Sequence, residues 1–200
     1  MKIYEAVYMP QGNIRWEQVK AAELENMQWL DAPHIRATAQ VCYNENALHV
    51  RLQATEKDIL CRFNGDTDEV CMDSCLEFFF SPTADGRYFN IESNPNGALY
   101  VGIGYSRYRH IRLYDPQLRQ QLQVQPFVTN DGWGVEMAIP ASFIQLLYPG
   151  FAFAPGMQMR ANFYKCGEDT KIPHYLTWNK VDVKEPDFHL PEFFGKLILK

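Results

Sequence analysis

Two segments of this chain alternate apolar and polar residues around a short turn, and this pattern limits the possible folds more than any other feature. In the segment 35–56 (IRATAQVCYNENALHVRLQATE), apolar residues recur at every second position on both sides of YNEN. The segment 121–140 (QLQVQPFVTNDGWGVEMAIP) repeats the pattern around NDG. Alternation of period two beside such a turn is typical of a β-hairpin with one buried face. We therefore expect two antiparallel hairpins.

The other segments favour the same architecture. MQMRANFYKC (157–166) and GKLILK (195–200) predict further strands. PASFIQLLY (140–148) predicts one short helix over 141–147, and the segment 16–30 is a second helical candidate with irregular apolar spacing. Many strands at short intervals, without a βαβ rhythm, indicate an all-β fold. We expect an antiparallel, jelly-roll-like β-sandwich of two packed sheets with one or two short helices, forming a single domain over residues 1–200.

Charge and composition exclude several classes of partner. The net charge is −5, from 19 basic and 24 acidic residues, and no long basic cluster occurs. Nucleic acid and anionic membranes are therefore poor candidates. No stretch has the length of a signal-peptide core or a membrane span, so we expect a cytoplasmic protein as the sequence stands, or a secreted one if a leader was trimmed. The sequence does not indicate the oligomeric state.

The five cysteines are odd in number and show neither CxxC nor paired-ligand spacing. This usage is typical of free thiols, and we predict that no disulfide supports the fold.

Polar residues repeatedly interrupt an otherwise apolar stretch, DSCLEFFFSPTADGRYFNIESNPNGALYVGIG (73–104). Its acids and amides either lie on a solvated sheet face or line a rim where a hydroxyl-rich ligand could bind.

Several segments, taken in order, resemble the family 9 carbohydrate-binding modules within the wider DOMON-like superfamily. They are ALHVRLQATEKD (47–58), DSCLEFFFSP (73–82), YFNIESNPNGALY (88–100), DGWGVEMAIP (131–140), MRANFYKC (159–166), LTWNK (176–180) and PDFHLPEFFGKLIL (186–199). The resemblance implies a sandwich of two antiparallel sheets. It also implies a non-catalytic domain associated with glycan degradation, whose partner is a mono-, oligo- or polysaccharide.

A sugar site needs an aromatic plate for the C–H face of the ring and planar polar groups for its hydroxyls. The resemblance implies two tryptophans around the sugar, and Trp178 corresponds to the C-terminal one. Cys71 and Met72 stand where the first would be expected. The polar candidates are Asp73, Glu77, Arg87, Asn94 and Asn179.

Each of these residues also has a structural interpretation. Trp178 could be a core residue, Glu77 could lie on a solvated sheet face, and Asp73 and Asn94 could fix turns. If Trp178 is a core residue, the exposed tyrosines Tyr105 and Tyr108 are the next candidates for a plate.

The acidic stretch 64–73 contains four carboxylates within eight residues: Asp66, Asp68, Glu69 and Asp73. Such density can hold Ca²⁺, and the resemblance implies a structural calcium. The stretch lacks the spacing of a twelve-residue calcium loop, so a solvated acidic turn is the alternative.

Three other functions stay open. The fold could serve a structural or protein-interaction role after losing the sugar site. Glu77 and Glu92 could form the carboxylate pair of a glycoside hydrolase. Met72 and His174 could bind haem axially, as some DOMON-like domains do.

Overall fold

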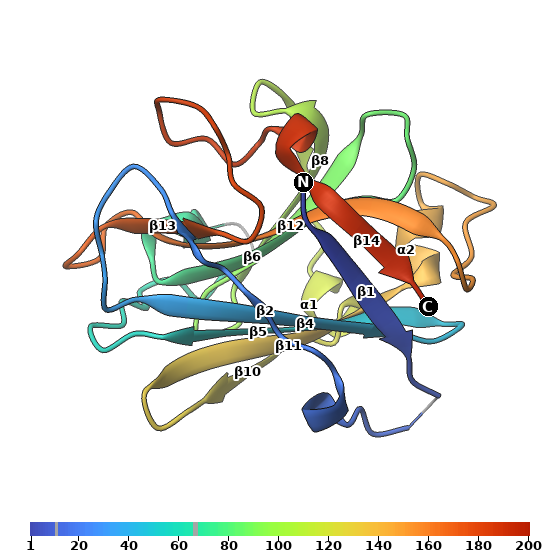
Figure 1. Cartoon of the computed structure of the whole chain (residues 1–200), viewed down its shortest axis with the longest axis horizontal. Coiled ribbons are helices and arrows are strands. Elements are labelled where there is room, and N and C mark those ends of the chain that lie inside the picture. The colour runs from blue at the N-terminus through green and yellow to red at the C-terminus, as the bar shows by residue number, and fades with distance from the viewer. Residues whose placement is uncertain (11, 66–67) are drawn as a thin grey trace.

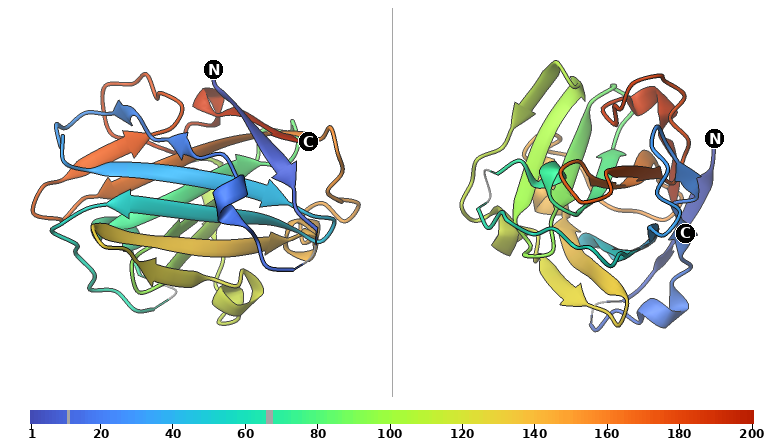
Figure 2. Two further views of the ribbon diagram at one scale, coloured as in Figure 1. Left: turned by 60° about the horizontal axis from the view of Figure 1, so that its bottom comes forward. Right: turned by 90° about the vertical axis from the view of Figure 1, so that its left-hand side faces the viewer.

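The computed structural model describes residues 1–10, 12–65 and 68–200, and these residues are mostly β-strands. The strands form two layers packed face to face (Figure 1). In Figure 2 (left), the layer with β4, β5 and β11 lies in front, and strands of the other layer cross behind it. The predicted β-sandwich is confirmed.

The two layers are named the lower and the upper sheet, after their places in Figure 1. The lower sheet contains β10 (Gln125–Val128), β11 (Gly132–Pro140), β5 (Ala47–Thr55), β4 (Arg36–Tyr43) and, beside β4, β2 (Ala22–Glu23). The upper sheet contains β14 (Gly195–Leu199), β12 (Gln158–Gly167), β6 (Cys75–Ser81), β7 (Tyr88–Ser93), β8 (Leu99–Ser106) and β9 (Arg109–Arg112), with β13 (His174–Thr177) beside β12 and β3 (Asn26–Met27) beside β13.

Strand β1 (Ile3–Tyr8) joins the two sheets along one edge. Its first part pairs in parallel with β14, and its end pairs in parallel with β4. These parallel pairs are absent from the purely antiparallel sandwich that the sequence predicts.

Both predicted hairpins are present. Strands β4 and β5 pair antiparallel up to Tyr43 and Leu48, directly beside the turn. The side chain of Asn44 fixes this turn, because its Oδ1 accepts the N–H groups of Asn46 and Ala47 at 2.9 and 3.0 Å. An asparagine that bonds backbone groups two or three residues ahead is a common way to close a turn.

The main core lies between the sheets. The lower sheet contributes buried aliphatic side chains such as Val50 and Leu52. The upper sheet contributes a stack of phenylalanines, in which Phe78 lies 5.0 Å from Phe80 and 5.3 Å from Phe163 between ring centroids. Offset aromatic stacking at this separation adds to the stabilisation from burial.

The upper sheet is buried on its outer face as well. The C-terminal segment 181–194 covers this face and packs against it, with Phe188 stacked on Tyr164 at 4.1 Å. Every residue of β6 and β7 is consequently buried. Strands buried on both faces lose the simple alternation of apolar and polar residues, which explains why the segment 73–104 lacks it.

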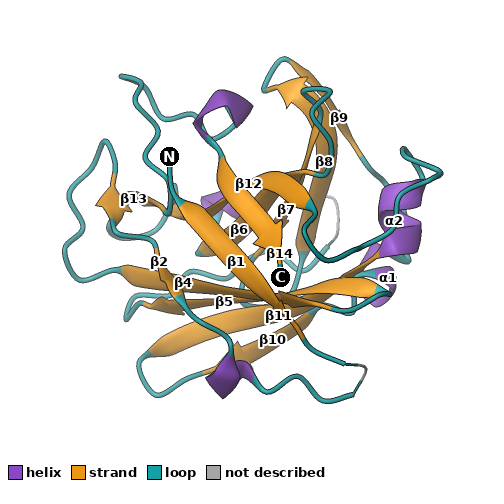
Figure 3. Cartoon of the chain, turned by 45° about the vertical axis from the view of Figure 1, so that its right-hand side comes forward, coloured by secondary structure: helices purple, strands orange, loops and turns teal. Residues whose placement is uncertain are grey.

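Helices are few and short. The predicted helix is confirmed as α2 (Ala141–Gln145), which buries Phe143 and Ile144. The helix considered for 16–30 is wrong, because that segment forms a 3-10 turn, η1 (Trp16–Gln18), and then the edge strands β2 and β3. The remaining short elements are α1 (Leu118–Gln121), η2 (Val70–Met72) and η3 (Pro191–Phe193). Figure 3 shows α1 and α2 at the same end of the sandwich. Among the described residues, no helix has the length and apolar character needed to cross a membrane.

Candidate functional site

A polar cavity of about 160 Å³ lies between the outer face of the upper sheet and the C-terminal segment. Its lining residues are Glu69, Cys71, Glu77, Glu92, Tyr100, Arg107, His110, Cys166, Glu168, Phe188 and His189. They come from several strands and from the loops at the end of the sheet, so only the folded chain brings them together.

Strand register places two carboxyl groups next to each other in the cavity wall. Glu77 of β6 lies directly opposite Glu92 of β7. Directly opposed residues of antiparallel strands point to the same face, with Cβ atoms roughly 4.5–5.5 Å apart. The neighbours Leu76 and Phe78 point to the main core instead.

Both carboxyl groups are almost fully buried, and this changes their protonation. Burial raises the pKa of Glu77 to about 7, although the thiol of Cys166 donates to its Oε1 at 2.9 Å. Burial, and secondarily the charge of Glu77, raise the pKa of Glu92 well above its ordinary value. Asn90 donates to Glu92 Oε1 at 2.7 Å. Burial therefore favours the protonated form of Glu92, which can donate a hydrogen bond, and Glu77 can accept one.

The imidazole of His110 also lines this side of the cavity. His110 Nε2 lies 2.8 Å from Asn90 Oδ1, and because an amide oxygen only accepts, Nε2 carries the hydrogen. The His110 ring stacks on Tyr100 at 5.8 Å, and the guanidinium of Arg112 lies 4.0 Å above the Tyr100 ring. A Cβ at Gly102 would overlap both His110 and Asn90, so this arrangement requires glycine there.

The remaining lining groups come from loops. The Arg107 guanidinium donates to Asp187 at 3.1 Å, which links the β8–β9 turn to the C-terminal segment. His189 Nδ1 lies 2.7 Å from the hydroxyl of Tyr88. Burial is the main cause that lowers the pKa of His189 to about 3, so this ring is neutral. Burial also raises the pKa of Glu168. The cavity thus offers several donors and acceptors at short range.

Trp178 is a core residue, which corrects its predicted role as a stacking plate. Its side chain is only 4% exposed and contacts the rings of Phe163 and Tyr4 at 5.3 and 6.4 Å. A Cβ at Gly195 would overlap the indole ring, so the packing is tight. The indole does not line the cavity and has no free face for a sugar.

Asp73 and Asn94 hold a loop together and do not line the cavity. Asp73 is fully buried, and its carboxylate accepts the N–H groups of Arg62 and Phe63 at 2.8 and 2.9 Å. It also accepts the amide of Asn94 at 3.0 Å and Nε of Arg62 at 3.2 Å. Asn94 in turn accepts the N–H of Ala98. Both residues follow the structural interpretation of the sequence.

The acidic stretch fits calcium poorly at Asp73, whose oxygens already face four donors, including a cation. Asp68 accepts the N–H of Gly65 at 3.0 Å, and Glu69 pairs with Arg112 at 3.2 Å. Asp66 lies outside the described residues. Calcium binding by the other acids stays a prediction.

The other predicted site residues lie away from the cavity. Arg87 pairs with Asp85 and lies over the ring of Tyr148 at 4.7 Å. Asn179 accepts the N–H of Lys2 at 2.7 Å and donates to the carbonyl of Phe193. The fallback plates Tyr105 and Tyr108 are 42% and 93% exposed but line no part of this cavity.

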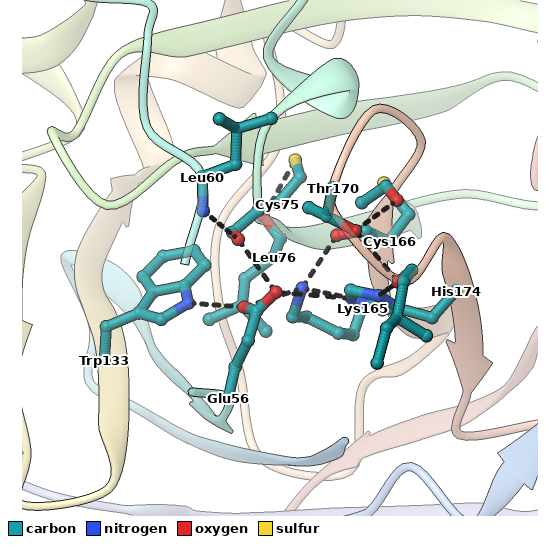
Figure 4. Close-up of polar contacts among 12 residues, drawn as sticks. Glu56, Leu60, Cys75, Leu76, Trp133, Lys165, Cys166, Thr170 and His174 are labelled. Carbon is teal, nitrogen blue, oxygen red and sulfur yellow. Dashed lines mark hydrogen bonds and ion pairs between the residues drawn. The ribbon is translucent and has the colours of Figure 1, made fainter. Parts of the chain in front are cut away.

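Figure 4 shows a second polar cluster, which connects the two sheets. The buried carboxylate of Glu56, just after β5, accepts Trp133 Nε1 at 3.1 Å and Ser74 Oγ at 2.8 Å. The ammonium of Lys165, on β12, lies 3.1 Å from the same carboxylate and 2.6 Å from His174 Nε2. Since all its members are buried and bonded, this cluster stabilises the interior.

The haem hypothesis is wrong for His174, because both of its ring nitrogens are occupied. Nδ1 bonds the carbonyl of Ile172 at 2.7 Å, and Nε2 faces Lys165. The ring therefore has no nitrogen free for iron, which leaves Met72 without its proposed partner.

Glu77 and Glu92, both considered from the sequence, line the cavity, whereas most of its other lining residues were not predicted. The register of the β6–β7 hairpin would have indicated that Glu92 lies beside Glu77. No local sequence pattern identifies Arg107, His110 or Glu168. These residues line a cavity only because the C-terminal segment covers the sheet and β9 forms its edge.

Comparisons with known proteins agree with this architecture. The family model described as "Carbohydrate-binding family 9" matches residues 9–199. A Bacteroides uniformis protein with a provisional carbohydrate-binding description is 25% identical, with a TM-score of 0.86 over 100% of this chain and 99% of that one.

Two structures of a family 9 carbohydrate-binding module from Caldicellulosiruptor kristjanssonii share the fold with TM-scores of 0.70. The complex with glucose is 14% identical, over 100% of this chain and 96% of that one. The complex with cellotriose is 15% identical, over 100% and 94%. No curated protein matches the sequence. The match over nearly the whole chain shows that this protein belongs to carbohydrate-binding family 9.

Proposed function

We propose that the protein binds a carbohydrate, without catalysing a reaction, in the polar cavity of the upper sheet. One observation carries this proposal. In a chain of carbohydrate-binding family 9, buried donors and acceptors from neighbouring strands converge on one small cavity. The structures of the Caldicellulosiruptor kristjanssonii family 9 module contain glucose and cellotriose, which supports a saccharide partner.

The size of the cavity favours a small ligand. At about 160 Å³, it is well below the roughly 300–1,000 Å³ of sites for drug-sized molecules. We therefore expect a single sugar residue to enter, either a monosaccharide or the end of a longer glycan. Tyr100 and Phe188 line the cavity, but their rings are already stacked on His110 and Tyr164, so neither is assigned as a plate. Without a tryptophan plate, affinity should be modest, in the micromolar to millimolar range.

The polar groups suit hydroxyl recognition. Protonated Glu92 can donate, Glu77 can accept, and Arg107 supplies a fixed cation at the rim. Hydrogen bonds that involve charged groups contribute about 1.5–3 kcal/mol each, enough to orient one sugar ring.

The arrangement of the carboxyl pair supports binding rather than hydrolysis. A glycosidase places its two carboxyl groups on either side of the scissile bond. Glu77 and Glu92 are neighbours on one sheet face, so they would approach a ligand from the same side. Incubation with the bound oligosaccharide should give no shorter products, and turnover that depends on this pair would refute the assignment.

A glycan array with the purified protein identifies the ligand, and calorimetry then tests the site. Arg107→Gln should weaken binding by about 10-fold or more, from the 1.5–3 kcal/mol of a charged hydrogen bond. Arg87→Gln is a matched control, because Arg87 also pairs with a nearby aspartate but does not line the cavity. Equal effects of the two substitutions, or no bound glycan on the array, would refute the proposal.

A further inference from the structure

We propose that Cys75, Glu77 and Cys166 form a binding site for a thiophilic divalent cation, with zinc as the expected metal. One sulfur from each cysteine and one oxygen of Glu77 all lie within 4.8 Å of one another. Within residues 1–10, 12–65 and 68–200, no other group of three or more histidine, cysteine or acidic side chains meets this criterion. The site goes beyond sugar binding and is argued without it, although Glu77 and Cys166 also line the proposed sugar cavity.

The three ligands are held by rigid neighbouring strands. Cys75 of β6 lies directly opposite Cys166 of β12, and Glu77 follows Cys75 by two residues. All three therefore point to the outer face of the upper sheet, where a thiol hydrogen of Cys166 already bonds Glu77 at 2.9 Å. A cation at this place would replace the two thiol protons, which pass to solvent. Sites built on strands keep their geometry better than sites on loops.

The donor set determines the class of metal. Two sulfurs with one carboxylate oxygen match the mixed ligands of zinc, whereas calcium and magnesium prefer oxygen alone. Binding requires both thiols to lose their protons to solvent and Glu77 to be ionised. Two thiolates, one carboxylate and a dication then leave one net negative charge, and the cations Arg107 and Lys165 both act on Glu77 through their fields.

The ion would have a route to the site and a place for a fourth ligand. Glu77 and Cys166 both line the polar cavity, whereas Cys75 lies fully buried behind them. Water in the cavity can complete the tetrahedral coordination that zinc adopts.

The test is metal binding by the reduced full chain in the absence of sugar. Under a non-chelating reductant, Co²⁺ should bind at one equivalent with a sulfur-to-metal charge-transfer band, and Zn²⁺ should displace it. Cys75→Ser and Cys166→Ser should each weaken binding by at least the roughly 10–100-fold that loss of an outer-shell partner costs. Cys42→Ser is the matched control, because Cys42 is also a buried thiol but lies on β4.

Wild-type protein without the charge-transfer band, or unchanged affinity in folded Cys75→Ser and Cys166→Ser, would overturn the proposal. If both serine variants misfold, Glu77→Gln decides, because it keeps both thiols and should still weaken Co²⁺ binding at least about 10-fold. Repeating the glycan calorimetry with a chelator measures sugar binding by the metal-free protein, so failure of the metal site and failure of the sugar site are distinguishable although both involve Glu77.

Discussion

Replacing Trp178 with alanine should damage the fold and not the carbohydrate site. The side chain is 4% exposed, and a tryptophan buries roughly 150–250 Å². At ~25 cal/mol per Å² this corresponds to about 4–6 kcal/mol, of which alanine keeps a small part. Large-to-small substitutions of tryptophan typically cost about 3–5 kcal/mol. In a domain of this size each kcal/mol lowers Tm by roughly 2–4 °C, so a fall of about 6–20 °C is expected.

Thermal denaturation followed by circular dichroism measures this fall. Tyr108→Ala is the control, because Tyr108 is 93% exposed and its loss should leave Tm almost unchanged. Below the transition, the folded Trp178→Ala protein should bind its sugar with nearly normal affinity. A variant with unchanged Tm and lost sugar binding would refute the assignment of Trp178 to the core and restore it as the plate.

Three further predictions concern Lys165, Gly102 and His189. Lys165→Met should destabilise the protein by about 3–5 kcal/mol in urea denaturation, because it leaves the buried Glu56 carboxylate without its cation. Adding Glu56→Gln should recover much of this loss, and strict additivity would contradict the pairing. Gly102→Ala should displace His110 and weaken sugar binding in calorimetry while the protein stays folded; unchanged affinity would remove His110 from the site. The pKa of His189 is lowered to about 3, so its stabilising contribution is complete above the ordinary value of about 6.5 and is lost as the pH falls below it. Between pH 7 and pH 5, this histidine should lower the free energy of unfolding by about 2 kcal/mol. If the pH dependence of unfolding is the same in His189→Gln as in the wild type, the reasoning is refuted.

The sequence by itself determined the architecture, because a sheet with one buried face requires alternation in the chain. The segments 35–56 and 121–140 predict the hairpins of the lower sheet, and Glu77, which the match at DSCLE indicated, lines the cavity. The short helix after Pro140 could also be predicted, since a proline at its start and apolar residues on one side are local signals. Such features depend on neighbours in the chain.

Only the tertiary structure decided which faces became a site. Trp178 stands where the family resemblance implies a sugar plate, yet the bend directly after β13 places its ring in the core. The C-terminal segment covers the outer face of the upper sheet and encloses its polar side chains in a cavity, and the missing alternation in the segment 73–104 does not identify which part of the chain provides that cover. Likewise Cys75 and Cys166, distant in sequence and without metal-ligand spacing, become direct neighbours through the pairing of β6 with β12. Contacts of this kind depend on how distant strands pair and pack, so no local pattern contains them.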